Sequence, residues 1–163
     1  MVNLYVIIKS VIEKGRIEMF MLTGEYSHQL DAKNRMRIPA KLRKELGDEY
    51  YFAKGANKCI YVFPKEAVEA QFEKLKEIKL SEIEKQKGLR AFAKSFVPAV
   101  EDGQGRVILP PELRSHAGMG KDDKELVICG AVSRVEIWSR KVYDEYFAGE
   151  EQDYDNLIAG LGI

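Results

Sequence analysis

Apolar and polar positions along this chain form short stretches that predict strands more often than helices. Residues 20–30 alternate loosely between the two kinds of side chain, which is typical of a strand. Tyr50–Ala53 and Cys59–Phe63 are apolar runs joined by KGANK, a connection suited to a hairpin. Glu125–Cys129 and Val135–Trp138 repeat this pattern near the C-terminus. The sequence therefore predicts a mainly β core.

Helical spacing follows each predicted hairpin. Residues 65–95 carry an imperfect apolar stripe among many Lys and Glu side chains, and Gly88 is the expected break. A shorter helix is expected at Lys141–Ala148, and the acidic run EEQDYDN after it is expected to be mobile. We interpret the apolar stripe as a packing surface.

Proline and glycine delimit two further short helices. Pro39 is expected at the first helical position of Ala40–Leu46, and Gly47 ends that helix. One proline of the pair at 110–111 opens a second helix, which ends at Gly118.

The chain contains one motif twice. Residues 31–47 read DAKNRMRIPAKLRKELG, and residues 102–118 read DGQGRVILPPELRSHAG, at an offset of 71 positions. Four extra residues then enter the second copy, and the register resumes at an offset of 75, where Gly55 matches Gly130. Because a unit this small cannot bury its apolar face alone, we expect one pseudo-symmetric fold built from both copies.

Each copy opens with a D-x-x-x-R turn. Asp31 can accept hydrogen bonds from nearby backbone N–H groups, and Asn34 tolerates the left-handed conformation that Gly105 supplies in the second copy. An arginine four residues after an aspartate can close such a turn with a salt bridge. We expect that role for Arg106 with Asp102.

The two copies differ in charge. The formal net charge of the 163-residue chain is zero, so overall balance indicates no polyanionic partner. Residues 31–46 nevertheless carry net +4, whereas residues 102–117 are neutral. A solvated turn with scattered charge would explain this; alternatively, the first copy alone carries a basic surface that pairs with phosphates. The basic residues of the first copy are Lys33, Arg35, Arg37, Lys41, Arg43 and Lys44.

Cysteine and histidine usage does not indicate catalysis, a metal or a cofactor. Cys59 and Cys129 occupy non-equivalent positions among apolar neighbours, so buried reduced thiols are expected. His28 and His116 lack Cys or His partners at ligand spacing. No stretch approaches the ~20 apolar residues of a membrane span, and the N-terminus does not resemble a signal peptide. We expect a cytoplasmic protein that is not an enzyme.

The motifs as a set resemble the MraZ family. The first copy reads G-E-Y-x-x-x-L-D-x-K-x-R-x-x-I-P-A-x-x-R, and the second reads D-x-x-G-R-x-x-L-P-x-x-L-R-x-x-A-G. The resemblance runs from about Met19 to Phe147, and Asn34 stands where the family commonly has Gly. It implies an α+β, mainly β fold: a pseudo-twofold swapped-hairpin β-barrel, as in the AbrB and SpoVT regulators, built from a tandem repeat with flanking helices.

The resemblance also implies a domain plan. An N-terminal extension (1–18) precedes the first AbrB-like repeat (19–97), the second repeat (98–148) and an acidic C-terminal tail (149–163). Family members usually begin shortly before the G-E-Y segment, so we expect a natural start at Met19 or Met21, or a dispensable extension. The mass of the native protein would decide between these starts.

The implied function is that of a bacterial transcription regulator. Such a protein would bind double-stranded DNA at short direct repeats upstream of its own division and cell-wall operon. It would act as a ring-shaped homo-oligomer associated with the nucleoid. The alternative is an oligomeric protein-interaction or antitoxin-like scaffold, which would not shift DNA carrying the upstream repeats better than random DNA.

The first copy supplies the candidate DNA contacts. Arg35 is expected as a structural anchor or a base reader, and it points to the same side of its strand as Arg37. Lys33 and Arg37 are expected to contact phosphates or a groove, with Lys41 and Arg43 on the same basic surface. Closure of the turn by a salt bridge is the competing role for Arg35.

Overall fold

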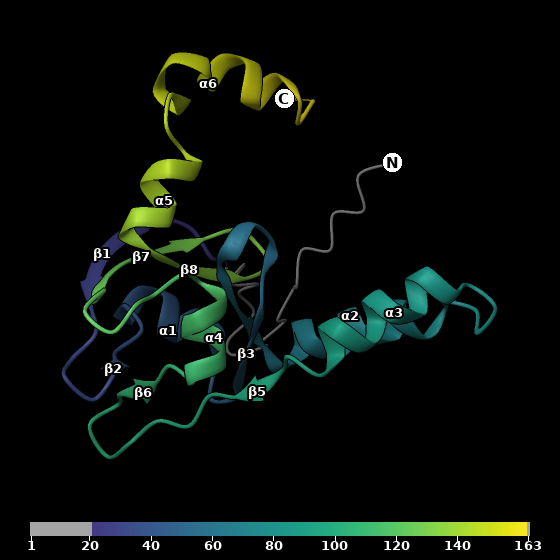
Figure 1. Ribbon diagram of the computed structural model, residues 1–163, viewed down its shortest axis with the longest axis horizontal. Helices are drawn as coiled ribbons and strands as arrows, with labels where there is room; N and C mark the ends of the chain where they lie inside the picture. The colour runs from purple at the N-terminus through teal and green to yellow at the C-terminus, as the bar shows by residue number, and fades with distance from the viewer. Residues whose placement is uncertain (1–20, 163) are drawn as a thin grey trace, which may run out of the picture.

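The computed structural model describes residues 21–162, so the expected extension 1–18 lies outside the described residues (Figure 1). The elements follow the two-copy plan, although the domain boundaries themselves stay predictions. The first copy contains β1 (Glu25–Gln29), β2 (Arg35–Met36), α1 (Ala40–Leu46), β3 (Tyr50–Lys54), a 3-10 turn (Ala56–Lys58), β4 (Ile60–Pro64), α2 (Lys65–Lys76) and α3 (Ile83–Ala93). The second contains β5 (Val97–Pro98), β6 (Val107–Ile108), α4 (Pro111–His116), β7 (Glu125–Gly130), β8 (Val135–Ser139), α5 (Arg140–Tyr146) and α6 (Glu150–Ala159).

The strand order of the main sheet is palindromic with respect to the repeat. The order is β1–β7–β8–β4–β3–β5, and all of its pairings are antiparallel. In the repeat, β1 corresponds to β5, β3 to β7 and β4 to β8. The first strand of each copy therefore pairs with the hairpin of the other copy, which makes the two copies one folding unit.

Two residue pairs mark the pseudo-twofold axis. Tyr61 pairs with Glu136 at the centre of the sheet, and Met36 pairs with Val107 in the separate two-stranded ribbon of β2 and β6. Each pair joins counterparts in the repeat, at offsets of 75 and 71. The axis consequently passes through both pairs and relates the two D-x-x-x-R turns.

The expected fold class is confirmed only in its coarser part. The protein is α+β with antiparallel strands and flanking helices, but more of the described residues lie in helices than in strands, so the mainly β expectation is wrong. A closed barrel is not confirmed either, because no ladder joins the edge strands β1 and β5 within residues 21–162.

One apolar core serves both copies. Leu42 and Leu46 of α1 belong to the same buried cluster as their counterparts, Leu113 of α4 and Ala117 directly after that helix. All four are at most 2% exposed. The two short helices thus support the ribbon and the sheet from a shared interior.

The expected long helix is two helices. The chain turns at residues 77–82 rather than at Gly88, which lies inside α3 with open space beside it. The side-chain amide of Gln86 donates hydrogen bonds to the carbonyls of Ile78 and Lys79, which fixes the turn. Helices α2 and α3 lie side by side as an arm that projects from the sheet (Figure 1). No helix within residues 21–162 combines the length and apolar character needed to cross a membrane.

Two local expectations also need correction. Pro39 occupies the N-cap position of α1, with ψ of 133°, rather than the first helical position. Residues expected to be mobile after α5 instead form α6, which follows Gly149 at φ of 89°. Tyr154 lies in that acidic run and Leu157 directly follows it, at helical spacing, a pattern that the charge of the run obscured.

We expect Leu42→Ala to lower the free energy of unfolding by about 2–5 kcal/mol, because it opens a cavity in the shared core. Lys44→Ala, on the exposed face of the same helix, is the matched control and should change it by less than about 0.5 kcal/mol. Urea denaturation measures both variants. Equal losses for the two would contradict a shared core at this helix.

Candidate nucleic-acid interface

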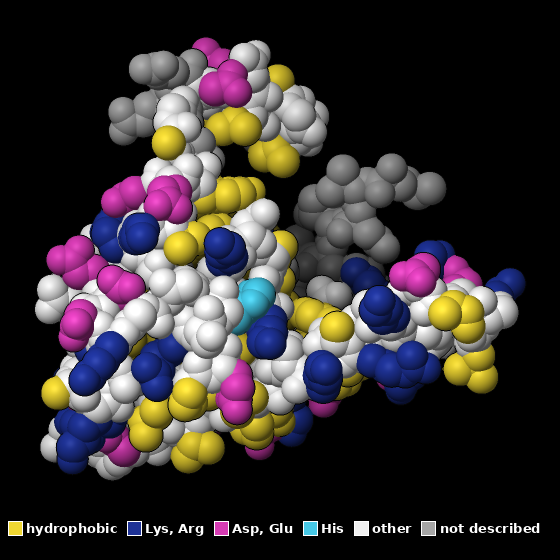
Figure 2. All heavy atoms as spheres, viewed as in Figure 1, with side chains coloured by type: hydrophobic (Ala, Val, Ile, Leu, Met, Phe, Trp, Pro, Cys, Tyr) yellow, Lys and Arg dark blue, Asp and Glu magenta, His cyan; other side chains and the backbone are white. Residues whose placement is uncertain are grey.

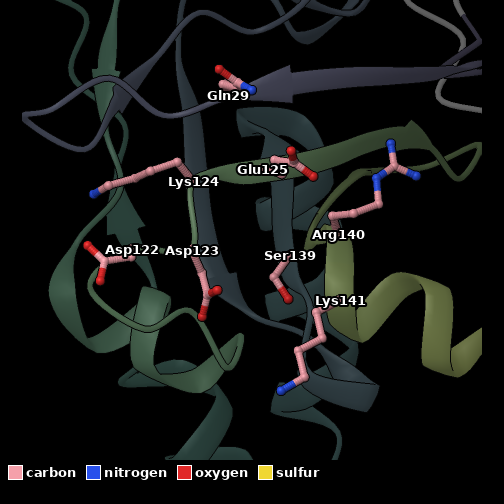
Figure 3. Close-up of a pocket in the computed structure, with 8 residues that line it drawn as sticks. All are labelled: Gln29, Asp122, Asp123, Lys124, Glu125, Ser139, Arg140 and Lys141. Carbon is pink, nitrogen blue, oxygen red and sulfur yellow. The ribbon is translucent and has the colours of Figure 1, made fainter.

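A hollow of about 410 Å³ lies between the end of β1, the loop before β7 and the start of α5 (Figure 3). Its carboxylates and cations are equal in number, and several have partners: Asp123 accepts the N–H of Gly120, and Arg140 donates to Ser27. The balanced charge gives this hollow no preference for an anion. Its lining residues are Gln29, Asp122, Asp123, Lys124, Glu125, Ser139, Arg140 and Lys141.

Neither free cysteine is suited to nucleophilic chemistry. Cys59 is buried as expected, whereas Cys129 is only partly buried. Burial raises the pKa of each thiol to about 12, so the reactive thiolate is suppressed at neutral pH. Among residues 21–162, no group of three or more His, Cys, Asp or Glu side chains is placed to hold a metal ion.

The first D-x-x-x-R turn is closed by its aspartate, as expected. Asp31 Oδ1 accepts the backbone N–H groups of Lys33 and Arg35 at 2.9 Å each, and Oδ2 accepts Arg35 Nε at 2.8 Å. The hydrogen bond from the backbone of Arg35 is the main reason that the pKa of Asp31 is lowered. The turn is therefore rigid, and both carboxylate oxygens of Asp31 accept hydrogen bonds within it.

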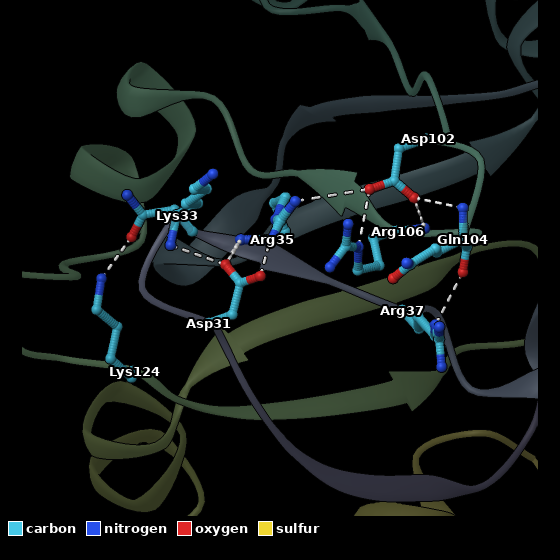
Figure 4. A network of polar contacts seen from close by, with 9 residues as sticks. Asp31, Lys33, Arg35, Arg37, Asp102, Gln104, Arg106 and Lys124 are labelled. Atoms are coloured by element: carbon cyan, nitrogen blue, oxygen red, sulfur yellow. Dashed lines mark hydrogen bonds and ion pairs between the residues drawn. The ribbon is translucent and has the colours of Figure 1, made fainter.

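The second turn repeats this network (Figure 4). Asp102 Oδ1 accepts the N–H groups of Gln104 and Arg106 at 2.9 and 3.0 Å, and Oδ2 accepts Arg106 Nε at 2.8 Å. The expected ion pair between Arg106 and Asp102 is confirmed. The two copies thus share one scaffold at this site.

The tips of the turns use the left-handed backbone that the sequence predicted. Asn34 has φ of 58° and Gly105 has φ of 71°. The Asn34 side chain also accepts a hydrogen bond from Lys124 Nζ, which ties the first turn to the loop before β7 (Figure 4). Glycine could not form this contact, so asparagine adds an anchor here.

The ribbon of β2 and β6 brings the two turns side by side. Arg37 Nε donates to the backbone carbonyl of Gln104 in the other turn at 2.9 Å. Arg35 Nη1 lies 3.8 Å from Asp102 Oδ2, so Arg35 forms an ion pair with a carboxylate of each copy. These contacts hold the two turns as one unit.

Arg35 is held as a structural anchor by this geometry. Its side chain is 22% exposed and is bound through Nε to Asp31. Base reading by its remaining N–H groups is untested and stays a prediction.

The guanidinium group of Arg43 is bound by other groups of the protein, which does not favour its expected role in DNA binding. Its Nε donates to Glu101, its Nη1 donates to the carbonyl of Gly47 at 2.6 Å, and its guanidinium lies 5.4 Å from the ring centre of Tyr50. The bond from Arg43 is the main reason that the pKa of Glu101 is lowered. The sequence did not predict this cluster. Its one local signal is the position of Glu101, directly before the aspartate of the second turn, Asp102.

Four basic side chains of the first copy remain exposed. Figure 2 shows several Lys and Arg side chains over the end of the molecule that carries β2 and β6, and others along the arm of α2 and α3. Their repeat counterparts are uncharged or acidic, so the basic surface belongs to one copy only. The exposed residues are Lys33, Arg37, Lys41 and Lys44, and their counterparts are Gln104, Ile108, Glu112 and Ser115.

Acid should loosen the second turn at unusually low pH. Hydrogen bonds from backbone N–H groups, chiefly that of Arg106, lower the pKa of Asp102 from its ordinary 3.8 to about 2. The pKa of this carboxyl group is lower in the folded state than in the unfolded state. The carboxylate therefore stabilises the fold at pH values above the pKa of the unfolded state, and this contribution is lost as pH falls to about 2. NMR titration of the Asp102 carboxyl carbon measures this.

In the same titration, Arg106→Gln keeps the backbone N–H donors and should raise the midpoint only part of the way. A titration midpoint of Asp102 at its ordinary pKa of 3.8 in the wild-type protein would contradict the hydrogen-bond network of the second turn.

The fold and the site together define an α+β tandem-repeat protein whose two D-x-x-x-R turns are joined in one ribbon. The family model of the MraZ protein matches residues 21–91 and 99–157, and the chain belongs to this family. Similar proteins carry the name Transcriptional regulator MraZ. The one from Carboxydothermus hydrogenoformans is 39% identical over 137 residues, covering 84% of this chain and 94% of its own. The one from Clostridium tetani is 39% identical over 150 residues, covering 88% and 100%.

Proposed function

We propose that this chain, a transcriptional regulator by family, binds double-stranded DNA sequence-specifically through the β2–β6 ribbon and the basic surface of its first copy. The observation that carries the proposal is the set of exposed cations around a rigid two-stranded ribbon. The major groove of B-form DNA is wide enough to admit such a ribbon. Turns that are already ordered lose little conformational entropy when they bind.

Four basic residues of the first copy have a role in this proposal. Lys33 at the tip of the first turn and Lys41 on α1 contact phosphates, which fix the register on the duplex. Arg37 uses one N–H for the Gln104 carbonyl and reaches a phosphate or a guanine edge with others. Arg35 orders the turn and contributes to base reading. Arg43 is left out of the DNA contacts.

The proposed targets are short direct repeats upstream of the chain's own division and cell-wall operon, with the protein acting at the nucleoid in the cytoplasm. Family membership supports this target. No catalytic activity, metal or cofactor belongs to the proposal. The exchange of first strands between the copies supports a swapped-hairpin arrangement of the AbrB kind.

Removing exposed cations of the first copy should weaken binding and its dependence on salt. Lys33→Ala and Arg37→Ala should each lower affinity for a duplex carrying the upstream sequence. Each lost phosphate contact should flatten the salt dependence by about one unit of slope. Fluorescence anisotropy over a range of salt concentrations measures both effects, and Gln104→Ala, at the counterpart of Lys33, is the matched control.

Unchanged affinity and salt slope in both variants would place the DNA elsewhere. Equal binding of the wild-type protein to the upstream duplex and to a scrambled one would instead favour the protein-interaction alternative.

We also propose that several copies close into a ring. Two pseudo-equivalent faces on one chain allow a head-to-tail contact, which closes when the rotation permits. Repeated DNA sites would then meet the same ribbon in series, which raises the effective concentration of each later contact. Light scattering at micromolar concentration should give several times the mass of one chain, and the mass of a single chain would contradict the ring.

A further inference from the structure

The outer face of the β2–β6 ribbon carries an exposed isoleucine among arginines. Arg35 pairs with Ile108, and Met36 pairs with Val107. Met36 and Val107 are buried, so their neighbours in the ribbon turn outward. Ile108 is 58% exposed. By the same register, Arg37 lies across from Arg106.

The core does not require an apolar residue at this position. Val107 and Leu109, on either side of Ile108, are both fully buried and already supply the inward contacts of the second copy. The counterpart of Ile108 in the first copy is Arg37, which is exposed. The position is thus polar in one copy and apolar in the other without a difference in packing.

The pseudo-twofold axis relates these residues in two pairs. It exchanges Arg35 with Arg106, and each of these arginines forms an ion pair with the aspartate of its own turn. It also exchanges Arg37 with Ile108, which have different chemistry. The ribbon therefore presents a symmetric pair and an asymmetric pair to whatever lies against it.

We propose that Ile108 is a specificity-determining residue that contacts the C5-methyl group of a thymine in the major groove. This inference rests on the proposed function. The thymine methyl is the apolar group that base pairs present in that groove, and apolar side chains contact it, whereas arginine takes guanine. Ile108 and Arg37 then read different bases, so the DNA site of one chain is not a palindrome and has a direction along the duplex.

The experiment first selects a site for the wild-type full-length protein from a library of randomised duplex DNA. Each thymine of that site is then replaced in turn by deoxyuridine, which removes only the methyl group. We expect one position to lose about fourfold in affinity, since burial of one such group is worth ~0.8 kcal/mol. Ile108→Ala should lose a similar factor and become insensitive at that same position.

Two further variants sharpen the result. Leu80→Ala changes an apolar side chain that is more exposed than Ile108, 85% against 58%, at the turn between α2 and α3, and it should leave both affinity and methyl sensitivity as in the wild type. Ile108→Arg restores chemical symmetry with Arg37, so its selected site should replace the thymine by guanine and approach a palindrome.

A selected site in which no thymine is sensitive, or in which Ile108→Ala stays sensitive, would overturn the inference and leave DNA binding in place. A changed assembly mass in Ile108→Ala with unaltered methyl sensitivity would overturn it by assigning Ile108 to a contact between copies. Failure of the wild-type protein to select any sequence would overturn the proposed function as well.

Discussion

The pairing of β2 with β6 is the constraint on which the site depends. Its central residues, Met36 and Val107, are buried in a core to which both copies contribute, so the ribbon has one position and one inward face. Both aspartate-capped turns are attached to this ribbon. Their geometry is therefore set by the duplicated core rather than by any ligand.

The sequence predicted the turns well because their interactions are local. Asp31 and Arg35 are four residues apart, and the left-handed conformation of Asn34 follows from its side chain. The Arg43–Glu101 pair could not be predicted, because its members are far apart in sequence and meet only when the copies exchange strands. The break after α2 was also misplaced, because a side chain, that of Gln86, fixes it rather than a glycine.

In the duplicated motif, the residues that hold the turns are the same in both copies, whereas the exposed residues around the turns differ. Both copies keep the aspartate, the arginine and the left-handed tip, and these residues hold the turns. The exposed positions around them differ between the copies: Lys33 corresponds to Gln104, and Arg37 corresponds to Ile108. A pseudo-symmetric chain can in this way present a surface without symmetry, which a homodimer of identical halves could not do.

The exchange of first strands has a consequence for the synthesis of the chain. Glu25 of β1 pairs with Cys129 of β7, so β1 leaves the ribosome long before its partner strand exists. The sheet can be completed only when nearly the whole chain has emerged, and such distant pairings slow folding. Until then the first hairpin lacks its neighbour β8 and exposes unpaired strand edges, so the nascent chain passes through a stage in which it is open to aggregation.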